Sequence, residues 1–306
     1  MEFIRPFLAT DLEQFDPGWA AAGHGHEASI FDREDLVDGA TWALVKSNLS
    51  FARMEYPASR LIFHFPVNDA NYTSDAQVRD RLWEAIDHLA AIGATGLVLH
   101  ANQTQPSSRW DTRAVMEARE RFLGFLPTLR QRVDGMPLWI GLENMPATGN
   151  DSSEFDPTLV YPEDYAGVCG GNIRATVDFC HLSYTDHVSA LTAAGKFADD
   201  RLYPHLRTCR FAEVWKLRDV VVHTHFSAFR GIALGTHRCV EGVLPDAGTL
   251  PASWYQEVLC AIASKWPGLA TMTFEVAERD YRRRQAFPRI VDWARSCLTT
   301  VIEEEP

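Results

Sequence analysis

Short apolar runs recur along the chain, and the stretches between them leave room for helices. Eight runs have the length of buried strands, at residues 3–8, 27–31, 60–67, 96–101, 138–144, 174–180, 220–226 and 271–276. Helical periodicity of apolar residues appears between several of them, at 74–92, 111–132, 253–264 and 285–298, while 186–218 is long enough for more than one helix. This alternation predicts a closed parallel (β/α)8 TIM barrel.

The clearest helical pattern is at residues 74–92. Ser74 and Gln77 have the spacing of a capping box at its start, and Gly93 is placed to end it. One face of this helix would carry the apolar residues Val78, Leu82, Ala85, Ile86 and Leu89.

The chain shows no linker and no internal repeat across its 306 residues. Alternating barrels routinely reach this length as one unit, so we expect a single domain over residues 1–306. The longest break in the pattern is at residues 146–163, which are rich in residues typical of loops. We expect this segment to cover a site and not to separate domains.

Charge and targeting signals limit the classes of partner. The net charge is −12, and the only run of basic residues is the three arginines at 282–284, so nucleic acid is a disfavoured partner and a small molecule is the expected one. The N-terminus has no long apolar segment, and no stretch reaches the roughly 18 apolar residues of a membrane span. The six cysteines form no CxxC pair, which is typical of reduced thiols. Together with the lack of an apolar targeting segment, this predicts a cytoplasmic protein.

Ionisable residues stand at the ends of six of the predicted strands. In barrels of this kind the carboxyl ends of the strands form the active site. A buried carboxylate is costly unless it is paired or binds something, and a mixture of carboxylates and imidazoles suits a hard or borderline divalent cation. The residues are His64, His100, Glu143, Asp178, His181, His223, His225 and Glu275.

The segments GLEN at 141–144, VDFCH at 177–181, HTH at 223–225 and FEV at 274–276 resemble the xylose isomerase-like barrels. That group includes sugar epimerases, sugar-phosphate isomerases and endonuclease IV. In its epimerase branch, strands five to eight provide four ligands to one divalent ion of the manganese, magnesium or cobalt type. The resemblance implies that these ligands are Glu143, Asp178, His225 and Glu275.

Such a metal site suits proton transfer beside a carbonyl, because the ion stabilises the resulting enediolate. The predicted function is therefore a metal-dependent isomerase or epimerase of a sugar, a sugar phosphate or a related hydroxy-carbonyl compound. Glu143 and Glu275 would serve as ligands and also exchange the proton on either face of the carbon. The resemblance further implies that His181 contacts substrate hydroxyls and that Arg230 reaches a substrate oxygen or phosphate.

The histidines are also compatible with a second hypothesis for the function. An endonuclease IV-like phosphodiesterase needs several metal ions, such as zinc, with further ligands on strands three and four, where His64 and His100 stand. His181, His223 and His237 are additional candidate ligands. The expected pair of ligands two residues apart after strand seven is missing, because His237 and Glu241 do not have that spacing. The same ligands would also permit a multi-iron redox enzyme.

Each candidate residue could instead have a purely structural role. A strand-end carboxylate can be a structural ion pair, and His64 and His100 can bind substrate, bind metal or simply hydrogen-bond a neighbour. His223 and His225 face the same side of a strand, so one of them suffices as a ligand, and the position of Arg230 favours His225. Glu27 is expected to face inward. Remaining candidates are a loop position for His24 and His26, a pocket or packing role for Trp110, Trp215 and Trp254, and a homodimer surface at 203–215.

Overall fold

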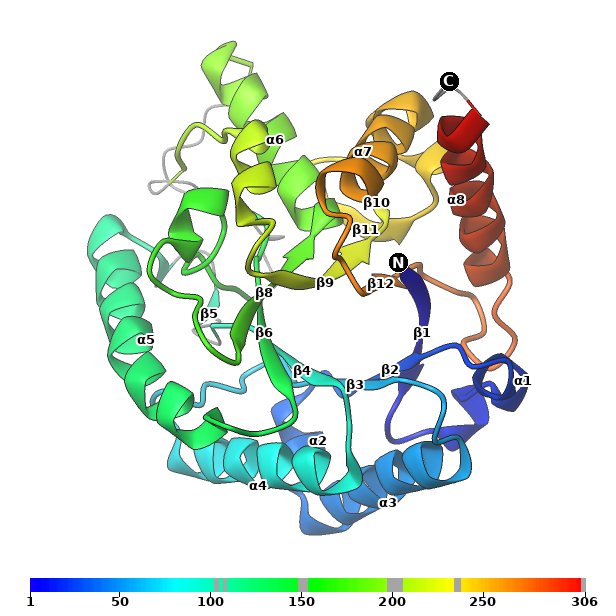
Figure 1. Cartoon of the computed structure of the whole chain (residues 1–306). Coiled ribbons are helices and arrows are strands. Elements are labelled where there is room, and N and C mark those ends of the chain that lie inside the picture. Colours follow the sequence, from blue (N-terminus) through cyan, green and yellow to red (C-terminus); the bar gives the residue numbers. More distant parts are fainter. Residues whose placement is uncertain (102–104, 107–108, 148–153, 197–205, 234–237, 304–306) are drawn as a thin grey trace.

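The computed structural model describes residues 1–101, 105–106, 109–147, 154–196, 206–233 and 238–303. Eight parallel strands form a closed barrel, surrounded by helices, as predicted (Figure 1). In barrel order the strands are β1 (Glu2–Leu8), β12 (Thr271–Phe274), β9 (Val221–Phe226), β8 (Ile173–Asp178), β6 (Trp139–Glu143), β4 (Gly96–Leu99), β3 (Leu61–His64) and β2 (His26–Ser29). Pairing of β1 with β2 closes the ring.

Helices follow the strands and cover the outside of the barrel. They are α1 (Pro17–Ala21), α2 (Arg33–Val37), α3 (Gly39–Glu55), α4 (Ala76–Ile92), α5 (Thr112–Val133), α6 (Phe179–Ala193), α7 (Ala252–Lys265) and α8 (Ala286–Glu303). Short 3-10 helices lie at Leu12–Gln14, Pro162–Tyr165, Phe211–Leu217 and Pro245–Ala247. None of the helices in the described ranges is both long and apolar enough to cross a membrane.

Several predicted element boundaries differ from the structure by a few residues, and in two cases a side-chain cap explains the difference. Helix α4 begins after Asp75, whose carboxylate accepts hydrogen bonds from the backbone of Gln77 and Val78, so Ser74 does not form the predicted capping box. Gly93 ends this helix in the left-handed region at φ 71°, as expected. Strand β8 ends at Asp178 and not at residue 180, because Asp178 caps a helix that starts at the next residue.

The loops above the barrel carry two small antiparallel ribbons. Strands β5 (Gln105–Pro106) and β7 (Glu154–Phe155) pair with each other, and β10 (Ala228–Arg230) pairs with β11 (Val240–Val243). Residues 148–153 of the predicted covering loop lie outside the described residues, as do residues 197–205 of the segment expected to hold more than one helix. The described parts of that segment form most of α6 and the 3-10 helix at Phe211–Leu217.

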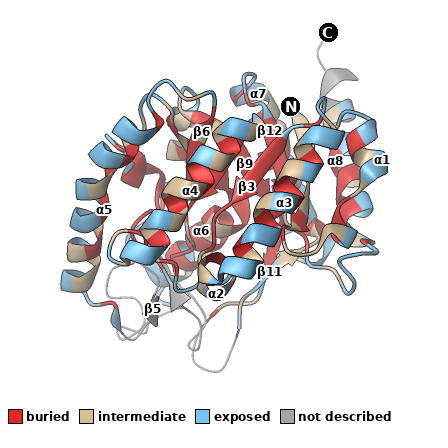
Figure 2. Cartoon of the chain, turned by 90° about the horizontal axis from the view of Figure 1, so that it is seen from below, coloured by how far each residue is buried: buried red, intermediate tan, exposed pale blue. Residues whose placement is uncertain are grey.

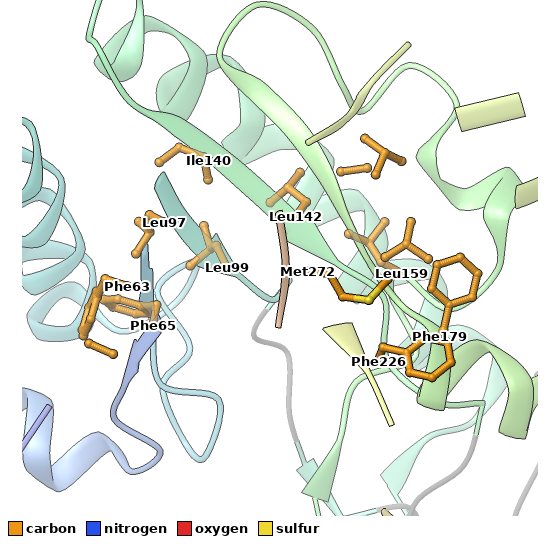
Figure 3. Close-up of a cluster of buried hydrophobic side chains, with 14 of the residues drawn as sticks. Phe63, Phe65, Leu97, Leu99, Ile140, Leu142, Leu159, Phe179, Phe226 and Met272 are labelled. Atoms are coloured by element: carbon orange, nitrogen blue, oxygen red, sulfur yellow. The ribbon is translucent and has the colours of Figure 1, made fainter. Parts of the chain in front are cut away.

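The main apolar core fills the space between the strands and the helices, where buried residues face inward from every helix (Figure 2). Alternation along each strand sends one set of side chains outward into this shell. Figure 3 shows members of the shell from neighbouring strands, including Phe63, Leu97, Leu99, Ile140 and Leu142.

A second apolar layer lies inside the barrel. Ile4, Ile62 and Val98 form it together with Trp139, and Gly96 leaves the space that the indole occupies, since a Cβ there would overlap the ring. The imidazole of His223 stacks on the same indole at 5.8 Å between ring centres. The apolar layer therefore ends where the polar residues of the strand ends begin.

Candidate metal centre

Period-two alternation directs a set of ionisable side chains into the upper end of the barrel. These residues belong to the barrel strands or directly follow them. Each points into the barrel because side chains two positions apart on a strand point to the same side. Except for Glu275, whose side chain is 34% exposed, all of them are buried. The set comprises Glu27, His64, Glu143, Asp178, His223, His225 and Glu275.

Glu143 is the centre of this arrangement. Its Oε2 lies 3.1 Å from Nε2 of His64 and 3.0 Å from Nε2 of His100, and its Oε1 lies 2.9 Å from Nδ1 of His225. Burial opposes ionisation of this carboxyl, but the surrounding imidazoles hold its pKa well below the ordinary value. Both oxygens of one carboxylate thus face separate groups of nitrogen donors.

Two of the groups that could hold a metal ion share Glu143. In one, the ligand atoms of Glu143, Asp178, His225 and Glu275 all lie within 4.8 Å of one another; in the other, those of His64, His100 and Glu143 do. The Nδ1 of His64 donates to the carbonyl oxygen of Phe65 at 2.9 Å, so Nε2, which faces Glu143, is the ring atom that could coordinate a metal ion. This orientation is the one that a metal-binding imidazole requires.

Glu27 positions His225 from below. Its Oε1 lies 3.0 Å from Nε2 of His225, and its Oε2 lies 3.0 Å from Nε2 of His223 and accepts a hydrogen bond from Thr273. With Nε2 engaged, His225 presents Nδ1 to Glu143 and, at 3.5 Å, to Glu275. A carboxylate that orients a metal-binding imidazole in this way is typical of metal sites.

His223 and His225 have different surroundings. His223 is tied to Glu27 and, through Nδ1, to Thr271 at 2.7 Å. It belongs neither to the two groups above nor to the third group of candidate ligands in the described residues, which consists of Glu27, His64, His225 and Glu275. Burial lowers its pKa. Burial also opposes protonation of His225, but the carboxylates of Glu143, Glu27 and Glu275 raise its pKa well above the ordinary value. The geometry thus brings His225, and not His223, to the candidate ligands.

Asp178 and His181 occupy the first turn of α6. The Oδ1 of Asp178 accepts the backbone N–H of His181 at 2.8 Å, and Nδ1 of His181 donates to the carbonyl oxygen of Asn144 at 2.8 Å. Asn144 also makes two hydrogen bonds to the backbone of Asp178, one to N–H and one to C=O. Nε2 of His181 lies 3.5 Å from the carboxylate of Glu241 on β11. His181 therefore lies at the rim of the site, on a helix and not on a strand.

Glu275 connects the metal-binding candidates to a cavity of about 440 Å³. Residues from the first, second and last strands and the loops after them line it, together with Glu241 and Gly242 of β11. Burial, and repulsion from Glu143, Asp178 and Glu27, raise the pKa of Glu275 to about 7. A carboxyl group with this pKa beside an open cavity can both accept and release a proton near neutral pH.

The other candidates from the sequence lie elsewhere. Arg230 ends β10 with an exposed side chain, and His237 lies outside the described residues. Trp215 packs against the rings of Phe179 and Trp266, which is a core contact. Trp110 packs against the start of α5, and Trp254 packs against aromatic neighbours, so neither lines the cavity described above. His26 is buried in the second strand and stacks on Phe15, which corrects its expected place in a loop.

Sequence reasoning missed two parts of this site. The role of Glu27 depends on its contact with residues nearly 200 positions away, although its place on an inward strand face was a usable signal. Asn144 was noted only as part of a motif, and its hydrogen bonds to Asp178 depend on the neighbouring positions of β6 and β8.

The donor set fits a divalent cation. Burial and Glu143 raise the pKa of Asp178, and the carboxylates of this cluster raise that of Glu275, so several carboxyl groups repel one another in a space with little water. A bound cation would remove this repulsion. Oxygen and imidazole donors in this proportion suit manganese, magnesium, cobalt, zinc or iron.

Comparisons with known proteins give matches at the level of structure only. No family model matches the chain, and no curated protein matches it in sequence. A solved D-tagatose 3-epimerase-like protein superposes with a TM-score of 0.61 at 17% identity, over 100% of both chains. The 3-keto-D-glucoside 4-epimerase YcjR from E. coli gives 0.58 at 15% identity, covering 97% of this chain and 100% of that one. The D-psicose 3-epimerase from Clostridium cellulolyticum H10 gives 0.57 at 9% identity, covering 97% and 99%.

Identities this low establish the fold and no shared activity. The matches nevertheless extend over nearly the whole length of both partners, and the closed barrel of eight parallel strands agrees with them. The chain has the xylose isomerase-like TIM-barrel fold.

Proposed function

We propose that this protein is a divalent-metal-dependent isomerase or epimerase of a sugar, a sugar phosphate or a related hydroxy-carbonyl compound. One observation carries the proposal. The ligand atoms of Glu143, Asp178, His225 and Glu275 lie within 4.8 Å of one another, and Glu275 also lines a cavity of a size suited to a small metabolite. The epimerases of the same fold support the proposal by analogy.

The chemistry divides between the cation and the side chains. When bound, a divalent ion of the manganese, magnesium or cobalt type supplies an electrophile that stabilises negative charge on the substrate oxygens beside the reacting carbon. Glu275 removes and returns the proton on that carbon, because its carboxylate lies at the cavity and beside the other candidate ligands.

The contacts of Glu143 favour a holding role over the acid/base role expected from the sequence. Both of its oxygens face imidazoles, and its side chain is almost fully buried. Isomerisation between neighbouring carbons requires only one base, whereas epimerisation requires a second group on the opposite face. Glu241 is the other carboxylate that lines the cavity, and it is 47% exposed, so it is our candidate for that second group.

The test is the variant Glu275→Gln, assayed with a panel of ketoses, aldoses and their phosphates. We expect a loss of turnover of about 100- to 10,000-fold, the range typical of a lost general base, with an unchanged circular dichroism spectrum. Solvent deuterium should enter the substrate of the wild-type protein at the reacting carbon and not that of the variant. Wild-type activity in the variant would contradict the role of Glu275.

The group formed by His64, His100 and Glu143 favours a second candidate, a multi-metal phosphodiesterase, because a carboxylate between two sets of nitrogen donors is suited to bridge two ions. Elemental mass spectrometry of protein purified without added metal separates the candidates. One manganese, magnesium or cobalt ion per chain supports the isomerase, and two or three zinc ions support the phosphodiesterase. Bound iron with visible absorption and oxygen consumption would support the redox enzyme instead.

A further inference from the structure

The cavity beside Glu275 has one cationic side chain among its lining residues in addition to its carboxylates. Arg284, the last of the three arginines at 282–284, lines this cavity together with Glu275 and Glu241. Its side chain reaches in from the loop between β12 and α8, and its guanidinium carbon lies 5.1 Å from the centre of the Tyr281 ring. The three arginines therefore do not form one surface patch, because Arg282 and Arg283 are exposed while Arg284 is buried.

Arg284 makes no hydrogen bond or ion pair with a carboxylate in the described residues, although the charge of Glu278 acts on it through space. The residue is only 9% exposed, and its Nε and Nη1 atoms are shut off from solvent without a hydrogen-bond partner among the described residues. Burial, and repulsion from Arg5, lower its pKa to about 10, so the guanidinium stays protonated at neutral pH. A buried and unpaired charge is costly, and proteins retain one where a ligand of opposite charge completes the site.

The carboxylates beside Arg284 and its neighbour Arg5 are engaged with other groups. Asp16 forms an ion pair with Arg5 at 2.8 Å. Glu278 accepts hydrogen bonds from the backbone N–H groups of Gln285, Ala286 and Phe287, which caps the start of α8. Neither carboxylate makes a hydrogen bond or an ion pair with Arg284 in the described part of the chain. The charge on Arg284 is thus available to a molecule in the cavity.

From this arrangement we infer that Arg284 binds an anionic group of the substrate, a phosphate or a carboxylate, while the reacting end of the substrate lies at Glu275. The guanidinium offers a planar fork that matches either group. This inference rests on the proposed function for its second half, since Glu275 is the proposed proton-transfer group. An anion-binding Arg284 favours a sugar phosphate or a sugar acid as the substrate and disfavours a neutral sugar.

Binding of simple anions tests, without any turnover, whether Arg284 binds an anionic group. Isothermal titration with inorganic phosphate and with malonate compares the wild-type protein with Arg284→Met and with Arg283→Met, a control at the adjacent exposed arginine. We expect the dissociation constant for at least one anion to rise about 10- to 100-fold in Arg284→Met and to stay unchanged in Arg283→Met. Anions bound only to a metal ion would be insensitive to both substitutions, and that result would overturn the inference.

Kinetics with matched substrates test whether the anionic group at Arg284 belongs to the molecule that reacts at Glu275. The panel holds a neutral ketose, its terminal phosphate and the corresponding terminal carboxylate, each assayed with wild-type protein, Arg284→Met, Arg284→Lys and Arg283→Met. The KM of Arg284→Met should rise at least tenfold more for one charged substrate than for the neutral ketose, with partial recovery in Arg284→Lys. The charged substrate that responds identifies the anionic group. Methionine retains about the length of the aliphatic part of arginine and lacks the buried charge, so the variant should keep the thermal stability of the wild-type protein.

The outcomes separate this inference from the proposed function. Turnover of neutral ketoses, with no preference for charged ones and no effect of Arg284→Met, would overturn the anion site and leave the isomerase standing. Arg284-dependent binding of phosphate or malonate, in a protein that turns over none of the sugars, would support the anion site and count against the isomerase.

Discussion

At the scale of single residues, the site is organised by carboxylates that orient imidazoles. Glu27 holds His225 and His223, and Glu143 meets His64, His100 and His225. Neither pattern follows from local sequence, because each contact joins residues tens or hundreds of positions apart. Strand-end positions identified the ionisable residues, whereas only the closed barrel determines which oxygen faces which nitrogen.

The variant Glu27→Gln tests the role of Glu27. An amide retains the size of the carboxylate but supports the orientation and basicity of His225 less well, so we expect metal affinity to fall about 10- to 100-fold. Competition with a fluorescent chelator measures that affinity. Glu257→Gln, at an exposed position on α7, is the control and should bind metal as the wild-type protein does. Equal affinity in the two variants would mean that Glu27 has only a structural role.

At the scale of elements, the strands were predicted better than the helices. All eight barrel strands were located within a few residues, because buried runs of alternating orientation leave a strong pattern. The helices α1, α2 and α3 in residues 17–55 were not predicted at all. Helix α3 buries one face with Trp42, Val45 and Leu49, but it also exposes Leu44, Phe51 and Met54, and these exposed apolar residues weaken its amphipathic pattern. The caps at Asp75 and Asp178 moved two further boundaries.

The packing of β6 against β8 depends on a glycine inside the barrel. A Cβ at Gly141 would overlap the hydroxyl of Thr176 and the ring of Trp139, so Gly141→Ala should destabilise the fold by about 1–3 kcal/mol. Gly124→Ala in α5 is the matched control, since a methyl group there meets no neighbour and alanine favours helix. Urea unfolding should move the two midpoints in opposite directions. A neutral Gly141→Ala would show that the barrel interior is looser than described.

The contact between α3 and α4 predicts a dependence of stability on pH. Partial burial opposes ionisation of Glu84, but hydrogen bonds from Lys46 and Arg81 lower its pKa to about 2, against 4.5 for the unfolded chain. The pKa of Glu84 is lower in the folded protein than in the unfolded chain. The interactions of ionised Glu84 with Lys46 and Arg81 therefore stabilise the fold above pH 4.5, and this contribution is lost as pH falls toward 2. Glu84 is 35% exposed, so the contribution is no more than about 1 kcal/mol.

Replacing Glu84 by Gln should therefore lower stability at pH 7 and leave it little changed near pH 2. Chemical unfolding at pH 7, 4.5, 3 and 2 measures the difference from the wild-type protein. Glu257→Gln again serves as the control for loss of an exposed carboxylate. A constant difference across the whole range would show that the variant acts through packing and not through charge.

At the scale of the whole molecule, the fold and the convergence of ionisable residues at the strand ends were predictable, and the contacts among these residues were not. The resemblance of four short segments indicated the barrel family, and the family places its active site at the strand ends. The cavity, and the burial of Arg284 in its wall, depend on the loops after β1, β9 and β12, whose conformations one sequence does not determine. If the protein is the proposed enzyme, its choice of substrate depends on the part of the molecule that sequence patterns describe least.

The final prediction concerns the stability of the whole protein and its dependence on metal. Four carboxylates, Glu27, Glu143, Asp178 and Glu275, converge at the top of the barrel, so removing a divalent ion should leave their repulsion uncompensated. A ligand present at 100 times its dissociation constant stabilises the folded state by about 2.7 kcal/mol, which in a chain of this length corresponds to roughly 4 °C in melting temperature. Chelation followed by dialysis should lower the melting temperature by this amount, and adding back manganese or zinc should restore it. The variant Asp178→Asn with His225→Gln, which lacks two candidate ligands, should melt at the same temperature with and without metal. Equal melting temperatures of wild-type protein before and after chelation, with metal loss verified by elemental analysis, would contradict a resident ion in this cluster.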